Sequence, residues 1–403
     1  MFKRKNIPNG SLSSIALASL LRNKTVIFSI VAIAIAILIS ILGYLITPDK
    51  TPFANDQHIE IAAKKPGFST LMLKIRNNEP EIHQSFITTL LYGKRSNYET
   101  VAIGRYAFSN DSITIWAPGE ISGSNDPGIS YLLQDVVYAL NENNKTTQQN
   151  VDIDGHPMET SVTKLREIVE DDHLLKKSFL LGTDRFGRDM LSQLMIGTRV
   201  SLSVGFISVL ISLILGIFLG ALAGFFRGKV DDLIIWFINV IWSVPTLLLV
   251  IAITFALGKG FWQVFIAVGL TMWVEVARVV RGQIISLREK EFVEAARALG
   301  YKNLRIIVKH ILPNTFGPVI VISAANFASA ILIEAGLSFL GIGVQPPMPS
   351  WGTMIKENYA YIILENPWLA LIPGIAIMVL VLAFMLIGNG LRDALDVKTN
   401  TVM

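Results

Sequence analysis

The stretch that decides the fold is a short segment that reads Glu294-Ala295-Ala296-Arg297-Ala298-Leu299-Gly300. It predicts a short helix whose exposed Ala-Ala-x-Ala face has little side-chain bulk, so a partner's groove could close around its backbone. Gly300 supplies a C-terminal stop, and Pro313 marks the next boundary because proline disfavours helix at the preceding residue. An Ala-rich helix end followed by glycine is also a common way for a helix to end. The location of the segment, in a basic loop between two apolar spans, favours a docking surface.

The composition around this segment is that of a membrane protein. Hydrophobic residues make up 52% of the 403 residues and charged residues only 16%. The mean hydropathy of +0.51 is too high for a soluble domain of this size. We therefore predict an all-α polytopic membrane protein.

Six apolar runs are long enough to cross a bilayer, which takes about 20 residues. They cover residues 25–46, 202–226, 233–257, 262–285, 316–339 and 368–387. The first run is too long for the apolar region of a cleavable signal and is predicted to be a signal-anchor.

Basic residues predict the orientation of these spans. Five precede the first span without an acidic residue among them, which predicts a cytoplasmic N-terminus: Lys3, Arg4, Lys5, Arg22 and Lys24. The short loops expected inside are also basic, whereas residues 341–367, expected outside, carry only Lys356. Six spans return the C-terminus to the cytoplasm.

These features divide the chain into five parts. They are a cytoplasmic tail at 1–24, a first helix at 25–46, an external domain at 47–180, a membrane core at 181–391 with the docking loop 286–315, and a cytoplasmic tail at 392–403. The external segment is polar and mixed, and is predicted to fold as a small α+β domain.

Within the external segment, residues 70–75 and 112–116 alternate as strands do. Apolar residues at helical spacing predict helices over 129–140 and 162–169, and the Asn-rich stretch 141–150 is predicted to be a loop. No catalytic constellation is evident, because the acidic residues lack an obvious partner set: Asp152, Asp154, Asp171 and Asp172. The chain has no cysteine, and its five histidines have no metal-site spacing.

Glycines and prolines mark the membrane spans. Gly216, Gly220 and Gly224 repeat every four residues, so one helix face permits close approach of another helix, although glycine is frequent in membrane helices anyway. Pro245 and Pro373 each remove a helical hydrogen bond and are candidates for gating hinges or static bends.

Three ionisable residues fall inside the spans, in addition to Arg281, which counts among the basic residues of the cytoplasmic side. Glu275 and Arg278 are three residues apart, which favours a structural pair on one helix face. Glu334 has no such neighbour and is predicted to face protein or water, since a lone charge at the bilayer centre costs at least about 3 kcal/mol. We expect Glu334 not to contact cargo.

The residues from 181 to 397 resemble the membrane permeases of ATP-binding-cassette (ABC) importers, in the dipeptide, oligopeptide and nickel branch. Asp184, Gly187, Arg188 and Asp189 belong to a stretch that resembles the branch signature, and residues 294–300 resemble the cytoplasmic loop shared by importers. Further matching stretches are 337–341, 345–347, 349–352 and 390–396. His310 stands where the general importer loop has an apolar residue, and this too resembles the peptide branch.

The resemblance implies a type I importer permease fold and a C-type subunit. It implies a heterodimer of two similar permeases, two cytoplasmic ATPase subunits that bind ATP and magnesium, and an external solute-binding protein, in a bacterial inner or plasma membrane. Residues 294–300 and Pro313 would dock the ATPase, and no cofactor or metal would bind this chain. Peptides are the expected cargo, with nickel or another solute as an alternative.

Other interpretations fit less well. A channel or carrier independent of ATP usually has more ionisable residues or broken helices near the midplane. A membrane-anchored enzyme or sensor would need a site in residues 48–179. The external domain, which the resemblance does not reach, is left with three roles: contact with a binding protein, contact with the partner permease, or bulk.

Overall fold

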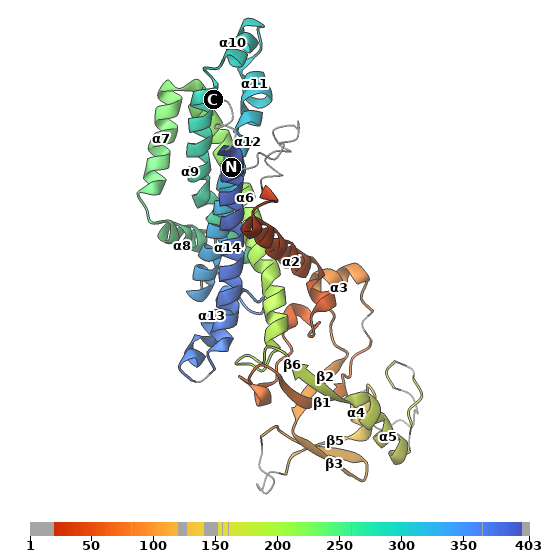
Figure 1. Cartoon of the computed structure of the whole chain (residues 1–403). Coiled ribbons are helices and arrows are strands. Elements are labelled where there is room, and N and C mark those ends of the chain that lie inside the picture. Colours follow the sequence, from red (N-terminus) through yellow and green to blue (C-terminus); the bar gives the residue numbers. More distant parts are fainter. Residues whose placement is uncertain are drawn as a thin grey trace, which may run out of the picture. The chain divides into compact units, whose positions relative to one another are not determined.

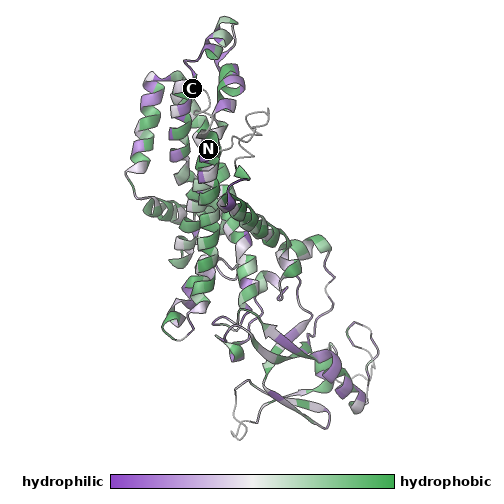
Figure 2. Ribbon diagram, viewed as in Figure 1, coloured by the Kyte–Doolittle hydropathy of each residue, from purple (hydrophilic) through white to green (hydrophobic). Residues whose placement is uncertain are grey.

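The computed structural model describes residues 20–396 except 82, 120–126, 141–151, 155, 160, 259 and 365. Most of the predicted N-terminal tail, the loop at 141–150 and the last seven residues, 397–403, lie outside the described residues. The chain forms two compact units: residues 1–40, 197–356 and 370–403 make the first, and residues 41–196 and 357–369 the second. Figure 1 labels their elements, and Figure 2 shows that the long helices are hydrophobic along most of their length.

Five described stretches are helical, long and apolar enough to span a membrane. They are α2 (Lys24–Ile46), α6 (Met190–Phe226), α9 (Phe261–Leu287), the stretch that ends in α12 (Leu312–Phe339), and α14 (Trp368–Asp396). Shorter helices connect them: α10 (Glu291–Ala298), α11 (Asn303–Ile306) and α13 (Trp351–Asn358), the last followed by the 3₁₀ turn η6 (Tyr359–Ile362).

The third predicted span is not one continuous helix. It consists of α7 (Gly228–Trp242) and α8 (Thr246–Leu257), which meet at 93°. Pro245 is the N-cap of α8 with extended backbone (ψ 127°), so the chain turns there rather than bending mildly. The expectation of a kink within one helix is therefore corrected to two helices with a sharp break between them, called here the broken span. Pro373, in contrast, lies inside α14, which continues past it.

The second unit contains two three-stranded antiparallel sheets. In the first, β1 (Phe68–Arg76) lies between β2 (Tyr98–Ile103) and β6 (Leu174–Phe179). In the second, β4 (Ser112–Trp116) lies between β3 (Arg105–Ser109) and β5 (Ile129–Leu132). The unit also carries α3 (Phe86–Tyr92), α4 (Leu133–Val137) and α5 (Val162–Ile168), with a π-helical turn η4 (Val169–His173) after α5.

A single apolar core joins both sheets to α4 and α5. Leu73, Ile103, Ile113, Leu133 and Val136 are at most 1% exposed and belong to this core. Both predicted strands are confirmed, as β1 and β4.

The helix predicted from residue 129 is wrong over its first turn. Residues 129–132 form β5, in which Ile129 pairs with Ile115 of β4, and only residues 133–137 are helical. Cross-strand pairing outweighs the helical spacing of the apolar residues there.

Candidate functional site

The docking segment forms α10, but its two faces differ from the prediction. Val293 is fully buried and Ala296 only 3% exposed, and both pack into the core of the first unit beside Ile306 and Ile307. Ala295 is exposed, as are Glu294, Arg297, Ala298 and Leu299. The predicted Ala-Ala-x-Ala surface is thus corrected, because Ala296 attaches the helix to its own chain. The exposed strip at spacing i, i+3, i+7 is Phe292, Ala295 and Leu299.

The end of α10 depends on Gly300. Its φ of +76° lies in the left-handed region. The Gly300 amide donates to the Arg297 carbonyl (2.9 Å) and the Tyr301 amide to the Ala296 carbonyl (3.1 Å). These two bonds are the Schellman pattern, which satisfies carbonyls left over at a helix end. A side chain at position 300 would meet no neighbouring atom within 4 Å, so backbone strain alone favours glycine there.

Pro313 does not mark a break in the helix. Ile311, the residue before the first turn of α12, has helical φ and ψ (−95°, −55°), and a π-helical turn η5 (Ile307–Ile311) leads directly into α12. A π turn re-spaces the backbone hydrogen bonds, so the missing N–H of a proline in the next turn is tolerated. As predicted, α12 begins at Leu312 with Pro313 in its first turn, but the helical backbone is continuous across this boundary.

The three glycines of α6 lie against α9. A Cβ at Gly216 would lie 2.5 Å from Val276 Cβ, and one at Gly220 would lie 2.5 Å from the Ala277 carbonyl oxygen. A Cβ at Gly224 would lie 2.9 Å from the Arg281 carbonyl oxygen. The two backbones are therefore closer than any side chain allows, which makes this stripe an intrachain contact.

The residues that resemble the branch signature form a buried charge network in the second unit. Arg188 Nε donates to Asp184 Oδ2 at 2.7 Å, and Arg188 Nη2 donates to Glu357 Oε2 at 2.6 Å. Asp184 Oδ1 also accepts from the backbone amides of Phe186 and Arg188, both at 2.9 Å. Burial alone would lower the pKa of Arg188, but the two carboxylates raise it. Glu357 could not be recognised as the partner from the sequence, since it lies 169 residues away from Arg188.

Gly187 and Asp189, the other two residues of the stretch that resembles the branch signature, determine the local backbone conformation. Gly187 has φ +75°, and a Cβ there would lie 1.7 Å from the His58 carbonyl oxygen, so no other residue fits. Asp189 stands before α6, where its Oδ2 accepts from the Ser192 amide at 2.9 Å and from the Ser192 hydroxyl. It caps the N-terminus of the second span.

The predicted pair of Glu275 and Arg278 is wrong for the part of the chain that the structure describes. Arg278 instead places its guanidinium 3.7 Å from the centre of the Trp242 ring. Glu275 is exposed and lines a cavity of about 300 Å³ between α7, α8, α9 and α12. Trp242 gave no signal in the sequence, because its approach to α9 depends on the broken span.

A further partner that the sequence did not suggest is Asp231 on α7. Both oxygens of its carboxylate accept from Arg281 on α9, at 2.6 and 2.7 Å. The sequence predicts for Arg281 only a part in orienting the protein, because Asp231 lies 50 residues away. This bidentate pair joins the two helices.

Glu334 faces protein, in keeping with the prediction. It is 0% exposed, and its Oε1 accepts from the Ser338 hydroxyl at 2.7 Å. The Ser338 oxygen in turn accepts from the Val344 amide at 3.2 Å, and the hydroxyls of Ser201 and Ser350 face the same carboxyl group. Oε1 of the carboxyl group is thus linked through Ser338 to the turn that follows α12, whereas Oε2 is buried without a hydrogen-bond partner among the described residues.

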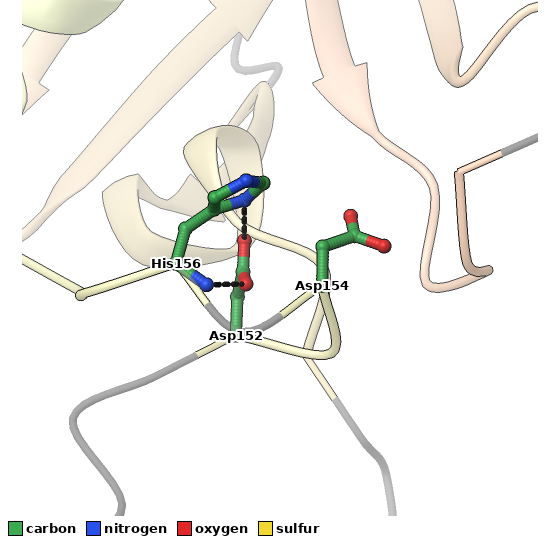
Figure 3. Close-up of side chains that lie close together, drawn as sticks. All are labelled: Asp152, Asp154 and His156. Carbon is green, nitrogen blue, oxygen red and sulfur yellow. Dashed lines mark hydrogen bonds and ion pairs between the residues drawn. The ribbon is translucent and has the colours of Figure 1, made fainter.

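Asp152 and Asp154, for which the sequence shows no partner set, have partners in the structure. Asp152, Asp154 and His156 place ligand atoms within 4.8 Å of one another. Figure 3 shows that His156 bonds Asp152 through both its ring and its backbone amide. Asp154 is engaged elsewhere, since its Oδ2 accepts from Arg76 at 2.5 Å, a bond that lowers the pKa of Asp154. These protein partners account for all three side chains as parts of a turn.

Comparison with known proteins adds the family to this geometry. Residues 216–400 match the family described as binding-protein-dependent transport system inner membrane component. The dipeptide transport system permease protein DppC of Alkalihalophilus pseudofirmus is 46% identical over 217 residues, 54% of this chain and 71% of that protein. The chain belongs to this family of ABC-importer permeases.

Two further relatives are similar to this chain over a comparable share. The glutathione transport system permease protein GsiD of Pectobacterium atrosepticum is 40% identical over 54% of this chain and 72% of that protein. The oligopeptide transport system permease protein OppC of Bacillus subtilis is 37% identical over 55% of this chain and 72% of that protein. The family match begins at residue 216, so both sheets of the second unit lie outside it.

Membership defines the general role of the chain. It is a multi-pass membrane protein and a permease subunit of a binding-protein-dependent ABC importer, not an enzyme. ATP hydrolysis in such importers belongs to a separate subunit, so partners include an ATPase and a binding protein.

Proposed function

We propose that this chain forms half of the translocation path of a bacterial importer for peptides. The observation that carries the proposal is α10, a short helix whose exposed strip is small or apolar and which is joined at both ends to membrane helices. The relatives named for dipeptide, glutathione and oligopeptide transport support peptides as the cargo class.

The proposed assembly has four kinds of partner. A second, similar permease completes the path, and two cytoplasmic ATPase subunits bind ATP and magnesium. A solute-binding protein delivers cargo from outside, and the lipid bilayer surrounds the spans. Both termini are cytoplasmic and residues 47–180 are external, in line with the basic residues that flank the first span.

In this assembly α10 couples ATP to transport. When ATP closes the ATPase pair, the groove that holds residues 294–299 moves, and α9 and the helices from α11 to α12 move with it. Gly300 fixes where the helix ends, and Val293 and Ala296 hold it to the permease. Movement of the ATPase is thus transferred to the spans.

Adding bulk to the exposed strip tests the docking role. Ala295→Trp is expected to abolish recovery of the ATPase in a gentle detergent pull-down, because the side chain is exposed and a groove shaped for alanine cannot admit an indole. Thr163→Trp adds the same bulk at an exposed position of α5 and should leave ATPase recovery at the wild-type level. Equal recovery with both variants would mean that the docking face lies elsewhere.

Mass spectrometry of the same wild-type preparation tests the whole assembly. We expect a second six-span permease, an ATPase, a binding protein and a released peptide. Recovery of the wild-type chain alone, together with unaltered behaviour of Ala295→Trp, would favour a channel or carrier independent of ATP.

Gly300→Val tests the coupling step. A β-branched residue at φ +76° costs about 1–2 kcal/mol in the left-handed region, so the helix end should shift and transport per ATP hydrolysed should fall. The measurement is the ratio of peptide uptake to ATP hydrolysis in proteoliposomes. A normal ratio would remove Gly300 from the coupling mechanism.

A further inference from the structure

A carboxylate on α9 faces the cavity beside the broken span. Glu275 is exposed, although its neighbours Val274, Val276 and Ala277 are fully buried. The cavity has a volume of about 300 Å³. Its polar lining, apart from the carboxylate, comes from hydroxyl-bearing and indole side chains: Trp242, Thr246, Thr271 and Ser329.

Glu275 has no cationic partner among the described residues. Arg278, one turn away, lies with its guanidinium over the Trp242 ring at 3.7 Å. Asp231 holds Arg281, the next cation on α9, in a bidentate pair. An ionisable residue at membrane depth that lacks a partner in its own chain usually marks a path for a substrate or ion.

The non-helical backbone beside the cavity indicates that the cavity holds water and can admit a solute. Trp242, Val244 and Thr246 line the cavity where α7 ends and α8 begins, at the 93° break. Backbone without helical hydrogen bonds is tolerated at membrane depth only when it is covered by protein or lines an aqueous cavity. Carrier proteins place binding sites at such interrupted helices.

We infer that Glu275 binds the cationic group of the cargo, an ammonium or guanidinium, as it passes through this permease. The inference rests on the proposed function and adds to it a preference for cargo with a positive group. The cation comes either from the free N-terminus of a peptide or from a lysine or arginine side chain. A carboxylate accepts strong hydrogen bonds from either source.

A first experiment tests binding without transport. Dicyclohexylcarbodiimide, which modifies carboxyl groups in apolar surroundings, is applied to the full chain in detergent, and labelling of Glu275 is measured by mass spectrometry. Alanine amide, a cation, should protect Glu275, whereas the neutral N-acetylalanine amide at equal concentration should not. Fully buried Glu334 serves as the internal reference, whose labelling neither compound should change.

A second experiment compares uptake by the reconstituted importer. Four peptides are used: Ala-Ala-Ala, Ala-Lys-Ala and the N-acetylated form of each. Glu275→Gln should lower uptake of peptides with a positive group roughly tenfold or more relative to wild type, and leave acetylated Ala-Ala-Ala unchanged. If uptake falls only for the two peptides with a free N-terminus, the bound cation is the N-terminal ammonium. If uptake also falls for acetylated Ala-Lys-Ala, the lysine side chain is bound. Asp232→Asn removes an exposed carboxylate of α7 outside the cavity and should change no ratio.

The outcomes separate the inference from the proposed function. If the wild type transports no peptide, peptide cargo is wrong, and the protection experiment alone decides on Glu275. Equal protection by both amides, or by neither, overturns the inference. The inference is also overturned if Glu275→Gln lowers the uptake of all four peptides equally and the double variant Glu275→Gln/Arg278→Gln restores uptake. Glu275 would then be a structural partner of Arg278.

A separate observation concerns α3 in the second unit. On a helical wheel Phe86, Ile87, Leu90 and Leu91 occupy one arc, and the threonines and Tyr92 occupy the other. Most of the apolar arc is exposed: Phe86 is 68%, Ile87 66% and Leu91 50% exposed, and Leu90 is half-buried. The C-terminal end of α3 is fixed to the end of the first span. The Lys94 amide donates to the Lys50 carbonyl at 2.7 Å, four residues beyond the last residue of α2.

Charges flank this apolar arc as they do in helices at a membrane surface. Lys50, Lys94 and Arg95 are exposed beside the end of α3. An apolar helix face that is rimmed by basic residues and held next to the end of a spanning helix fits the boundary between headgroups and acyl chains. We propose that α3 lies in the bilayer interface with Phe86 and Ile87 among the acyl chains.

The lack of cysteine makes this proposal directly testable. Phe86→Cys, Thr88→Cys and Thr163→Cys are each spin-labelled in the full chain in lipid nanodiscs, and collision with oxygen and with a water-soluble nickel chelate is measured. We expect position 86 to favour oxygen, position 163 to favour nickel, and position 88, on the opposite face of α3, to lie between. Equal nickel access at 86 and 163 overturns the proposal, and so does shielding of position 86 from both reagents, which indicates a protein contact.

Discussion

Carboxylates in the second compact unit have different partners from the two carboxylates that lie within the predicted spans, Glu275 and Glu334. In the second unit Asp184 is paired with a buried arginine, Arg188. In the membrane helices Glu334 has hydroxyls around it, and Glu275 faces a cavity. A buried ion pair is retained where good geometry offsets desolvation, whereas in a span a carboxylate without a cation needs hydroxyl or water contacts. The nature of the partner therefore separates structural charges from charges that are free to bind something else.

The strongest test of this contrast removes the arginine of the network. Arg188→Met leaves Asp184 and Glu357 without their shared cation, and breaking such a buried pair costs about 3–5 kcal/mol. We expect a large fall in the thermal unfolding midpoint of the detergent-solubilised chain. Arg185→Met is the matched control, because Arg185 is exposed. Its guanidinium donates to the backbone carbonyl of Glu357 at 3.3 Å and not to the Glu357 carboxylate. Similar midpoints for both variants would show that the network is not a structural centre.

A second test uses pH at Asp56, another paired carboxylate of the second unit. Burial alone would raise its pKa, but the hydrogen bond from His58 and the attraction of His58 and Lys177 outweigh burial and lower the pKa from 3.8 to about 2. Because the pKa is lower in the folded chain, the stabilisation is complete above about pH 4 and is lost as the pH falls toward 2. With the His58 ring protonated, it amounts to about 2 kcal/mol.

The measurement is thermal stability between pH 7 and pH 3 for the wild type and Asp56→Asn. The variant should be less stable at pH 7, and the difference should shrink below pH 4. Asp171→Asn, at an exposed carboxylate, should follow the wild type throughout. A difference that stays constant with pH would assign the loss to packing rather than to charge.

The smallest effect is expected at Glu334. Glutamine keeps an oxygen that accepts from Ser338, and its amide supplies a donor toward the hydroxyl of Ser201, so Glu334→Gln should change stability by less than about 1 kcal/mol. Peptide uptake should match the wild type, in contrast to Glu275→Gln. Normal folding with lost uptake would show instead that the Glu334 carboxyl group takes part in transport.

Much of the membrane core could be predicted from the sequence, because lipid imposes a single strong rule on composition and length. Apolar runs located the spans, and Gly300 located the end of α10, since only glycine adopts its backbone at no cost. The angle at Pro245 is larger than the bend within one helix that the sequence predicts. A proline reveals a lost hydrogen bond, but the 93° angle depends on how α7 and α8 pack against α9.

The polar partners were harder to predict, for a different reason. Glu275 and Arg278 have the spacing of a pair, yet Trp242 offers Arg278 a closer contact that only the folded chain creates. Likewise Arg188 finds Glu357 across 169 residues, and β5 forms because Ile129 meets Ile115. Local periodicity carries no information about partners so distant in sequence.

The glycine contact between α6 and α9 has a mechanical consequence. Where a Cβ on Gly220 would meet the Ala277 carbonyl oxygen at 2.5 Å, α6 contributes no side chain that could shift under load. Only three residues separate the end of α9 from the start of α10. We therefore expect α6 and α9 to move together when α10 is displaced, rather than to adjust independently.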